Sequence, residues 1–213
     1  MNWANKITIS RLILIPIIVV LFLLSPRFYN VWTQSISINN FELSYAELIS
    51  GILFIIASLT DFLDGFIARK FNQVTTFGKF FDAIADKLLT NSVIVLFSAA
   101  KIIPVYIGII LICRDFLIDV LRQILAVKNV VLAANKMGKY RAAFIMVGLS
   151  ILFFLSYHNF KFTDYKYLWG EYGLINQLLL LPLYIGTILS VSSAINYLLL
   201  SKDALKNNDK KNG

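Results

Sequence analysis

Residues 61–86 carry the most informative pattern in the chain, and they read Asp61-Phe-Leu-Asp64-Gly65-Phe-Ile-Ala68-Arg69, then eight residues, then Gly78-Lys-Phe-Phe-Asp82-Ala-Ile-Ala-Asp86. In the first half, Asp61, Asp64 and Ala68 are spaced i, i+3 and i+7, and the second half repeats its fixed residues every four positions. Residues three and four apart lie on the same side of an α-helix. The stretch therefore predicts two α-helices, each with one acidic face.

The chain around this stretch is too apolar for a water-soluble domain. Hydrophobic residues make up 58% of the 213 residues, and the mean hydropathy is +0.73, whereas soluble domains contain about 45–50% apolar residues. Because a helix needs roughly 20 apolar residues to cross a bilayer, the pattern predicts an all-α, polytopic membrane protein with six transmembrane helices. The expected spans are Ile9–Leu24, Ala46–Lys70, Gly78–Ala100, Ile103–Val127, Met137–Tyr157 and Gly173–Leu200.

The two ends of the chain are expected to differ from this core. Residues 1–11 have the spacing of a short interfacial helix that lies on the membrane before the first span. Residues 1–200 are expected to form a single membrane domain that includes this helix. The polar, basic segment 201–213 is expected to be a cytoplasmic tail that frays.

Basic residues set the expected orientation in the cell membrane. With the N-terminus in the cytoplasm, fifteen of the 20 Lys and Arg residues fall in inside segments and four fall in outside segments. Such a bias favours a multi-pass protein with both termini in the cytoplasm. The net charge of +8 is then explained by cytoplasmic loops that face anionic lipid, and nucleic acid is not an expected partner.

The two acidic faces are expected to meet. The short link Lys70–Phe77 makes the two helices antiparallel neighbours, so Asp61, Asp64, Asp82 and Asp86 share one depth at the cytoplasmic side. Four ionised carboxylates so close together would repel one another. Two divalent cations would remove the conflict, and oxygen ligands favour Mg²⁺ or Mn²⁺ over zinc. A metal pair of this kind clamps in-line displacement at phosphorus.

The remaining fixed residues fit a phosphate ligand. Gly65 and Gly78 leave room for phosphates to approach the backbone, and Arg69 can neutralise a phosphate oxygen. A structural polar cluster or a cation pathway is the alternative interpretation. A transporter, however, would place its acidic groups near the membrane midplane, and it would not need two glycines and an arginine at fixed offsets.

The whole stretch resembles the signature of the CDP-alcohol phosphotransferase family, D-x2-D-G-x2-A-R-x8-G-x3-D-x3-D, with every fixed position met. The resemblance implies attack of an alcohol hydroxyl on the lipid-linked phosphorus of CDP-diacylglycerol, with CMP leaving. It also implies a homodimer. By motif position, Asp61, Asp64, Asp82 and Asp86 would hold the metals, and Asp86 would also be the catalytic base. The CDP-binding residues would be Asn5, Thr8, Asp61, Gly65, Ala68, Arg69 and Gly78.

Members of the family that use glycerol 3-phosphate give the best match outside the motif. Asn5-x2-Thr8-x2-Arg11 resembles their N-terminal pattern, although Trp3-Ala4-Asn5 replaces the usual Asn-Pro-Asn. Arg114-Asp115 with Arg122 resembles an Arg-Glu…Arg segment in the fourth span, with Asp for Glu. The segment Lys136-Met-Gly138-Lys139-Tyr-Arg141 resembles Gly-Lys-x-Lys, with Arg141 for Lys.

The charge of the acceptor supports this match. Glycerol 3-phosphate is a dianion near neutral pH, so its pocket should be rich in Arg and Lys. A lone arginine within a span is costly, which makes Arg114 the most telling candidate. The acceptor-phosphate set is Arg114, Arg122, Lys136, Lys139 and Arg141. The last three of these have a second interpretation, because basic residues at a span end also enforce orientation.

Several alternatives remain at this stage. The acceptor could be inositol phosphate, serine or a second lipid, and the chain could be an aspartate-rich prenyltransferase or a cation carrier. Asp115 and Asp119 are expected to pair with Arg122 or Arg114 rather than to act chemically. His158 is expected in a solvated loop, and Cys113 is expected to be a small buried hydrophobic residue.

Overall fold

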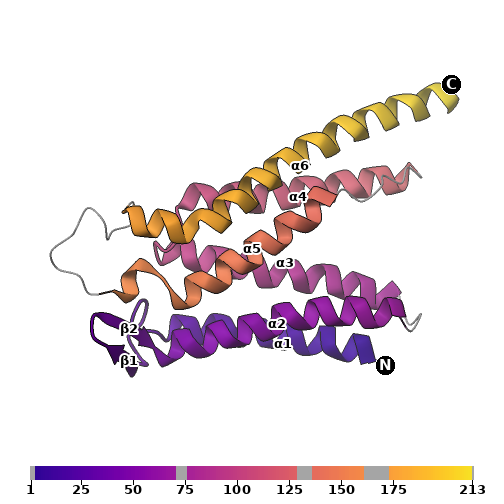
Figure 1. Cartoon of the computed structure of the whole chain (residues 1–213). Helices are drawn as coiled ribbons and strands as arrows, with labels where there is room; N and C mark the ends of the chain where they lie inside the picture. The colour runs from indigo at the N-terminus through magenta and orange to yellow at the C-terminus, as the bar shows by residue number, and fades with distance from the viewer. Residues whose placement is uncertain (1–2, 71–75, 129–135, 161–172, 213) are drawn as a thin grey trace. The chain divides into compact units, whose positions relative to one another are not determined.

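The computed structural model describes residues 3–70, 76–128, 136–160 and 173–212. Within that description, the side chains of residues 3–7, 61–70, 76–80, 83, 136, 157 and 203–212 are not included. Six α-helices make up most of the described chain (Figure 1), which confirms the six predicted helices. They are α1 (Trp3–Leu23), α2 (Tyr45–Lys70), α3 (Thr76–Ala99), α4 (Val105–Val127), α5 (Lys136–Phe154) and α6 (Leu174–Asn212).

The helices at the two ends of the chain extend further than the sequence predicted. Residues 1–11 do not form a separate interfacial helix, because α1 runs without a break from Trp3 to Leu23. Its interior Pro16 is tolerated in the helix. The segment 201–212, which was expected to fray, is also helical, since α6 continues to Asn212. Lys, Ala and Leu in this segment favour helix, so a helix that has already begun propagates into it.

The expected all-α class needs one correction. Strands β1 (Ser35–Ile38) and β2 (Phe41–Ser44) form an antiparallel hairpin between α1 and α2. The pairing joins Ile38 to Phe41 across a two-residue turn, and Asn39 in that turn has a positive φ of 52°. Asn is one of the few residues that adopts this conformation at low cost, which makes it typical of tight hairpin turns.

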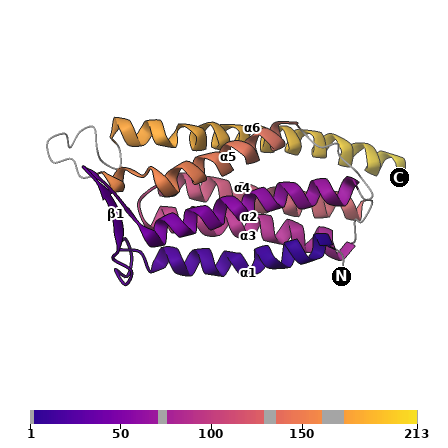
Figure 2. The same ribbon diagram turned by 60° about the horizontal axis from the view of Figure 1, so that its bottom comes forward.

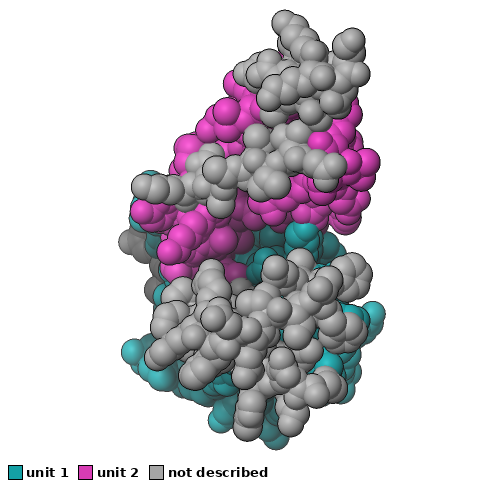
Figure 3. Space-filling model, turned by 90° about the vertical axis from the view of Figure 1, so that its right-hand side faces the viewer, with its two compact units in different colours: residues 1–104, 149–180 teal, residues 105–148, 181–213 magenta. Residues whose placement is uncertain are grey.

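The chain divides into two compact units, which Figure 3 shows in different colours. Unit 1 comprises residues 1–104 and 149–180, and unit 2 comprises residues 105–148 and 181–213. Helices α1, α2 and α3 with the hairpin therefore belong to unit 1. Helix α4, the first part of α5 and most of α6 belong to unit 2.

Aromatic side chains form the centre of unit 1. The ring of Phe153 lies 4.7 Å from that of Phe97, 5.3 Å from that of Phe54 and 5.6 Å from that of Phe22, measured between centroids. All four are almost fully buried. Edge-to-face pairs of this kind stabilise a core beyond the burial of their area. The cluster joins α1, α2, α3 and the end of α5.

Helix α1 packs against both α2 and α3. Its first residues lie at the same end of unit 1 as the last residues of α2 and the first residues of α3, and the hairpin lies at the opposite end (Figures 1 and 2). This arrangement brings the N-terminal part of α1 beside both halves of the acidic motif.

Glycines allow close approach of helices within unit 2. A methyl group on Gly186 of α6 would lie 2.8 Å from Ile145 Cγ1 and 3.3 Å from Ile145 N on α5. A methyl group on Gly148 of α5 would lie 3.2 Å from Leu183 N on α6. The two backbones are therefore close enough to exclude side chains at both positions, as small residues permit between apolar helices.

Two of the described helical segments, Met137–Phe154 and Leu174–Lys202, are long and apolar enough to cross a membrane. Thr8–Leu23 and Tyr45–Thr60 are shorter apolar helices. The sequences of α3 and α4 carry several charged residues each, which lowers their apolar character. The prediction of six transmembrane helices is therefore supported only for two segments by length and composition.

Large apolar side chains cover the outside of α4. Phe116 is 65% exposed, Ile109 is 57% exposed and Val120 is 54% exposed. Cys113 is also exposed, so the prediction that it is buried was wrong. Its apolar neighbours in sequence indicated an apolar environment, and they do not distinguish a protein core from a surface that faces lipid.

A buried ion pair ties the hairpin end of unit 1 together. Arg27 donates to Glu47 Oε1 at 2.8 Å, to Asn159 Oδ1 at 2.8 Å and to Ser156 Oγ at 3.5 Å. The backbone N–H of Glu47 donates to Ser44 Oγ at 3.2 Å, so Ser44 caps the start of α2. A polar cavity of about 390 Å³ lies beside this pair.

His158 lines the same cavity. Its side chain is exposed, as predicted, but it is close to two cations. Partial desolvation, together with the positive charges of Arg27 and Lys101, lowers the pKa of His158 from 6.5 to about 4. The imidazole is therefore neutral near pH 7, which is the form that a neighbouring positive charge favours.

We predict that Gly186→Ala lowers the melting temperature, because the new methyl group would press against α5 within unit 2. Gly138→Ala is the matched control: it lies on α5, where a methyl group would meet nothing within 4 Å. Alanine favours helix over glycine by about 1 kcal/mol, so the control should melt at the same temperature or higher. Thermal unfolding in detergent checks both, and equal behaviour of the two variants would contradict the close packing at Gly186.

We also predict that acid weakens the fold partly through His158. Because its pKa in the folded protein is about 4 and its ordinary value is 6.5, the unfolded chain binds the proton more readily. Stability therefore falls as the pH drops through this interval and is unaffected above it. Between about pH 7 and pH 5, the melting temperature of the His158→Gln variant should fall less than that of the natural protein. An identical loss in both proteins would show that His158 does not contribute.

Candidate active site

The two halves of the acidic motif lie where the sequence predicted them. Asp61, Asp64, Gly65, Ala68 and Arg69 belong to the last part of α2, which ends at Lys70. Residues Gly78, Asp82 and Asp86 belong to the first part of α3, which begins at Thr76. Helices α2 and α3 are in contact, and only residues 71–75 separate them. The motif therefore occupies one end of a helix pair.

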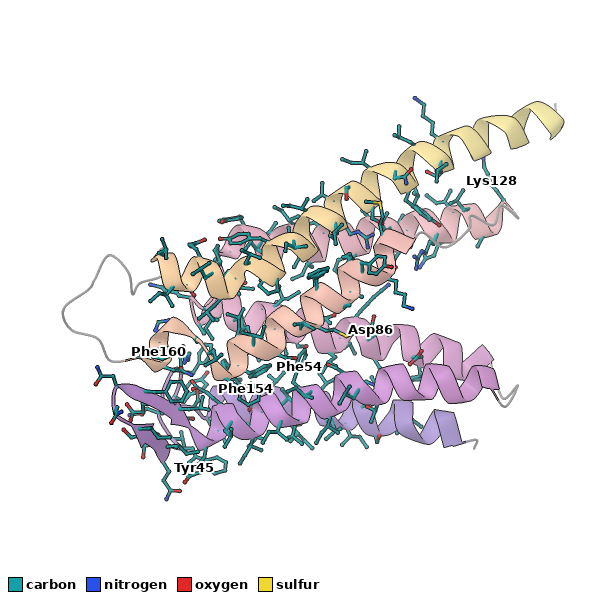
Figure 4. All side chains as sticks on the ribbon, in the orientation of Figure 1. Tyr45, Phe54, Asp86, Lys128, Phe154 and Phe160 are labelled. Carbon is teal, nitrogen blue, oxygen red and sulfur yellow. The ribbon has the colours of Figure 1, made fainter. Side chains whose placement is uncertain are left out.

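The structure describes the side chains of two of the four aspartates. Asp82 and Asp86 are one turn apart on α3, and both are partly buried. The carboxylate of Asp82 is 41% exposed. Figure 4 shows Asp86 well away from Tyr45 and Phe160, which mark the hairpin end of unit 1. The side chains of Asp61, Asp64 and Arg69 lie outside the described residues, so the expected meeting of the acidic faces stays a prediction.

Arg11 contacts the acidic motif, a contact that the sequence did not predict. Its side chain is fully buried, and its Nη1 donates to Asp82 Oδ1 at 3.2 Å. It extends from α1, which packs against both α2 and α3. A buried arginine requires a charge partner, and Asp82 provides one. The signal was present in the sequence, since Arg11 falls inside the first expected span, Ile9–Leu24. That arginine was used only for the orientation and for the N-terminal pattern.

The other N-terminal candidates lie on the same helix. Thr8 is one turn before Arg11 on α1 and is 3% exposed. Residues three apart share a face of the helix, so Thr8 lies on the side of α1 that Arg11 uses to reach Asp82. The side chain of Asn5 lies outside the described residues.

The donor set of the acidic motif fits divalent cations in chemistry. Carboxylate oxygens are the preferred ligands of Mg²⁺ and Mn²⁺, and Asp82 and Asp86 offer them on one face of α3. Among residues whose side chains are described, no group of three His, Cys, Asp or Glu residues that could hold a metal is found. The side chains of Asp61 and Asp64, the expected partners on α2, lie outside the described residues.

A second polar cluster lies in unit 2, around Arg114 and Arg141. Both arginines donate to the same carboxylate oxygen, Asp115 Oδ1, at 3.1 Å from Arg114 and at 2.5 Å from Arg141. Arg114 also donates to Ser190 O at 3.2 Å and to Ser193 Oγ at 3.4 Å. Arg141 donates to Ser190 Oγ at 3.3 Å. The cluster therefore joins α4, α5 and α6.

The predicted acceptor set is only partly brought together. Arg114 and Arg141 share a partner, and the expected pairing of Asp115 with Arg114 is confirmed. Arg122 is not hydrogen-bonded within this cluster among the described contacts, and it lies over the ring of Tyr197 at 5.8 Å from the centroid. Lys139 is exposed, and the side chain of Lys136 lies outside the described residues.

Serines on α6 were missed by the sequence reasoning. Ser190 is fully buried and Ser193 is 4% exposed, and both contact the arginines. Their spacing of three residues puts them on one face of α6. Serine is common in apolar helices, so nothing in the sequence alone separated these two from their neighbour Ser192.

Comparison with known proteins identifies the family of this chain. The family model described as CDP-alcohol phosphatidyltransferase matches residues 1–194, which include both halves of the acidic motif and the Arg114 cluster. The match therefore extends well beyond the 26-residue motif and covers elements of both compact units.

Three curated relatives carry the same name, CDP-diacylglycerol–glycerol-3-phosphate 3-phosphatidyltransferase. The chain is 34% identical to the protein from Bacillus subtilis (strain 168) over 205 residues, which is 96% of this chain and 97% of that one. It is 38% identical to the protein from Rickettsia typhi over 151 residues, covering 71% and 75% of the two chains. It is 33% identical to the protein from Mycoplasma genitalium over 195 residues, covering 91% and 81%.

Proposed function

The chain belongs to the CDP-alcohol phosphatidyltransferase family, and from this premise we propose that it transfers a phosphatidyl group from CDP-diacylglycerol to glycerol 3-phosphate. The products are phosphatidylglycerophosphate and CMP. The observation that carries this choice of acceptor is the similarity to glycerol-3-phosphate enzymes over nearly the whole chain. The paired arginines of unit 2 support it, since they suit an acceptor that carries a phosphate.

The reaction is an in-line displacement at phosphorus. A hydroxyl oxygen of glycerol 3-phosphate forms a bond to the lipid-linked phosphorus, and the bond from that phosphorus to the bridging oxygen of the diphosphate breaks. The bridging oxygen leaves with CMP, and the proton of the attacking hydroxyl passes to a carboxylate. We assign that role to Asp86, the last aspartate of the motif, which is only partly buried and so can receive a proton from a bound substrate.

Asp61, Asp64, Asp82 and Asp86 are the residues that would hold two divalent cations, Mg²⁺ or Mn²⁺. Such ions would neutralise the diphosphate and stabilise the charge on departing CMP. The protein's own contribution is to keep the carboxylates together at one end of α2 and α3. Arg11 contributes to this, because its hydrogen bond to Asp82 offsets one negative charge and limits the positions that this carboxylate can take.

We place the cytidine diphosphate group against the motif end of unit 1. Gly65, Ala68 and Gly78 are small residues in the sequence of α2 and α3, and they would leave room for the diphosphate beside the backbone. Arg69 would neutralise a phosphate oxygen. Asn5 and Thr8 of α1 would complete the CDP site, and the contact of Arg11 with Asp82 supports their place near it.

The proposal includes a membrane setting. We propose a multi-pass protein of the cell membrane with both termini and the acidic motif on the cytoplasmic side, which the distribution of Lys and Arg supports. Exposed apolar side chains on α4 support contact with lipid. A homodimer is part of the same proposal, and it rests on the family resemblance alone.

Release of CMP tests the function directly. Purified protein with CDP-diacylglycerol, Mg²⁺ and glycerol 3-phosphate should release CMP and form phosphatidylglycerophosphate. A panel of acceptors that includes inositol phosphate, serine and unphosphorylated glycerol should give much slower release. Faster release with another alcohol would change the acceptor, and no release with any alcohol would contradict the enzyme.

We predict that Asp86→Asn abolishes turnover, with a fall in kcat of at least about a hundredfold, because general-base catalysis contributes roughly 10²- to 10⁴-fold. Binding of CDP-diacylglycerol should be partly retained, since three of the four aspartates remain. Glu42→Gln is the matched control, because it makes the same carboxyl-to-amide change on the hairpin. Near-normal turnover of Asp86→Asn would show that another group takes the proton.

A further inference from the structure

Helix α6 contributes to the arginine cluster through three separate contacts. The backbone carbonyl of Ser190 accepts from Arg114 Nε, and its hydroxyl accepts from Arg141 Nη1. The hydroxyl of Ser193 accepts from Arg114 Nη2. Helix α6 therefore fixes specific N–H groups of both arginines, although Arg114 lies on α4 and Arg141 lies on α5. These contacts leave the remaining N–H groups of both guanidinium groups in a fixed orientation.

Asp115 lies between the two cations. Its Oδ1 atom accepts from Nη1 of both Arg114 and Arg141, and its side chain is 15% exposed. Two guanidinium groups so close together would repel each other in an apolar setting. The shared carboxylate offsets that repulsion and keeps both guanidinium groups beside Asp115.

The cluster is not electrically complete. Among the ion pairs of the described residues, the two arginines share the single carboxylate of Asp115, which leaves one positive charge in excess at this point. Arg141 Nε is also buried and has no acceptor among the described residues. A buried donor without an acceptor is costly, and a bound anion would supply both the missing acceptor and the missing charge. This pairing of excess charge with an unused buried donor indicates an anion site rather than a closed structural network.

We propose that Asp115, Ser190 and Ser193 are positioning residues that hold Arg114 and Arg141 as a preformed receptor for the phosphate of the acceptor. This inference rests on the proposed function, and it assigns three residues that do not touch the reacting atoms. Preorganisation is the physical reason, because groups that are already oriented lose less freedom when a ligand binds. The residues therefore set affinity for the acceptor and discrimination against alcohols without an anionic group.

The alternative role is purely structural, since the same contacts join α4, α5 and α6. A structural role and a positioning role make different predictions for the kinetics. Loss of a structural contact would lower stability and reduce activity with both substrates together. Loss of a positioning contact would raise the KM for glycerol 3-phosphate and leave the KM for CDP-diacylglycerol unchanged.

The test compares Asp115→Asn with Glu42→Gln, which makes the same carboxyl-to-amide change on the hairpin of unit 1. We expect Asp115→Asn to raise the KM for glycerol 3-phosphate by about tenfold or more, with the KM for CDP-diacylglycerol within about twofold of the natural value. Asp115→Glu keeps the charge and should recover most of the affinity. Ser193→Ala, which removes one contact to Arg114, should raise the same KM by about two- to fivefold.

A binding measurement makes the test independent of turnover. Inorganic phosphate should raise the melting temperature of the natural protein and of Glu42→Gln in detergent, and it should compete with glycerol 3-phosphate. Asp115→Asn should lose this stabilisation. Natural protein that releases no CMP would contradict the proposed function, whereas the phosphate response would still report on the receptor. The positioning role is overturned if Asp115→Asn retains the phosphate response, or if it raises both KM values equally.

Discussion

An ionised side chain among apolar helices has to be neutralised by a partner, and three polar sites in the described part of the chain meet this requirement. Arg11 is fully buried and donates to Asp82. Arg27 donates to Glu47 at the hairpin end of unit 1. In unit 2, Arg114 and Arg141 share Asp115. Because an unpaired buried charge is strongly unfavourable, each ion pair holds together the segments that carry its members. The charges of the sites thus also determine how the helices pack.

The three pairs are not equivalent. The Arg27 pair is matched in charge and has further hydrogen bonds to Ser156 and Asn159, which is typical of a structural connection. The Arg114 cluster has a positive excess, and the acidic motif has a negative excess in sequence that Arg11 offsets only in part. Sites with an uncompensated charge are the ones that can bind an ion or a charged substrate. On this basis, the motif suits cations and a diphosphate, and the cluster suits a phosphate.

Much of the fold could be predicted from the sequence, because helices in an apolar chain are set by local composition. Long apolar runs predicted all six helices, and the positions of the motif at the end of α2 and the start of α3 followed from helical spacing. The hairpin was missed, since its strands are only four residues long and two turn asparagines are a weak signal. The continuation of α6 to Asn212 was missed because a polar segment predicts fraying unless a helix already leads into it.

The candidate site was predictable where its residues carry charge. Asp82, Asp86, Arg114 and Arg141 all stand out as ionisable residues in apolar surroundings. The partners were harder to identify, because the link between Arg11 and Asp82 joins residues 71 positions apart and the link between Arg114 and Ser193 joins residues 79 apart. Such contacts depend on which helix faces meet, and spacing within one helix does not contain that information. Uncharged members such as Ser190 left no signal at all.

The central claim is that the carboxylates of α2 and α3 hold two divalent cations between them. Electron paramagnetic resonance of purified protein titrated with Mn²⁺ tests it most directly, because two ions about 3.5–4 Å apart give a spin-coupled spectrum. The account predicts two bound Mn²⁺ per chain with coupled spins, and loss of the coupling when Asp61 or Asp82 is changed to Asn. Binding of Mn²⁺ that is unaltered when both residues are changed would contradict it.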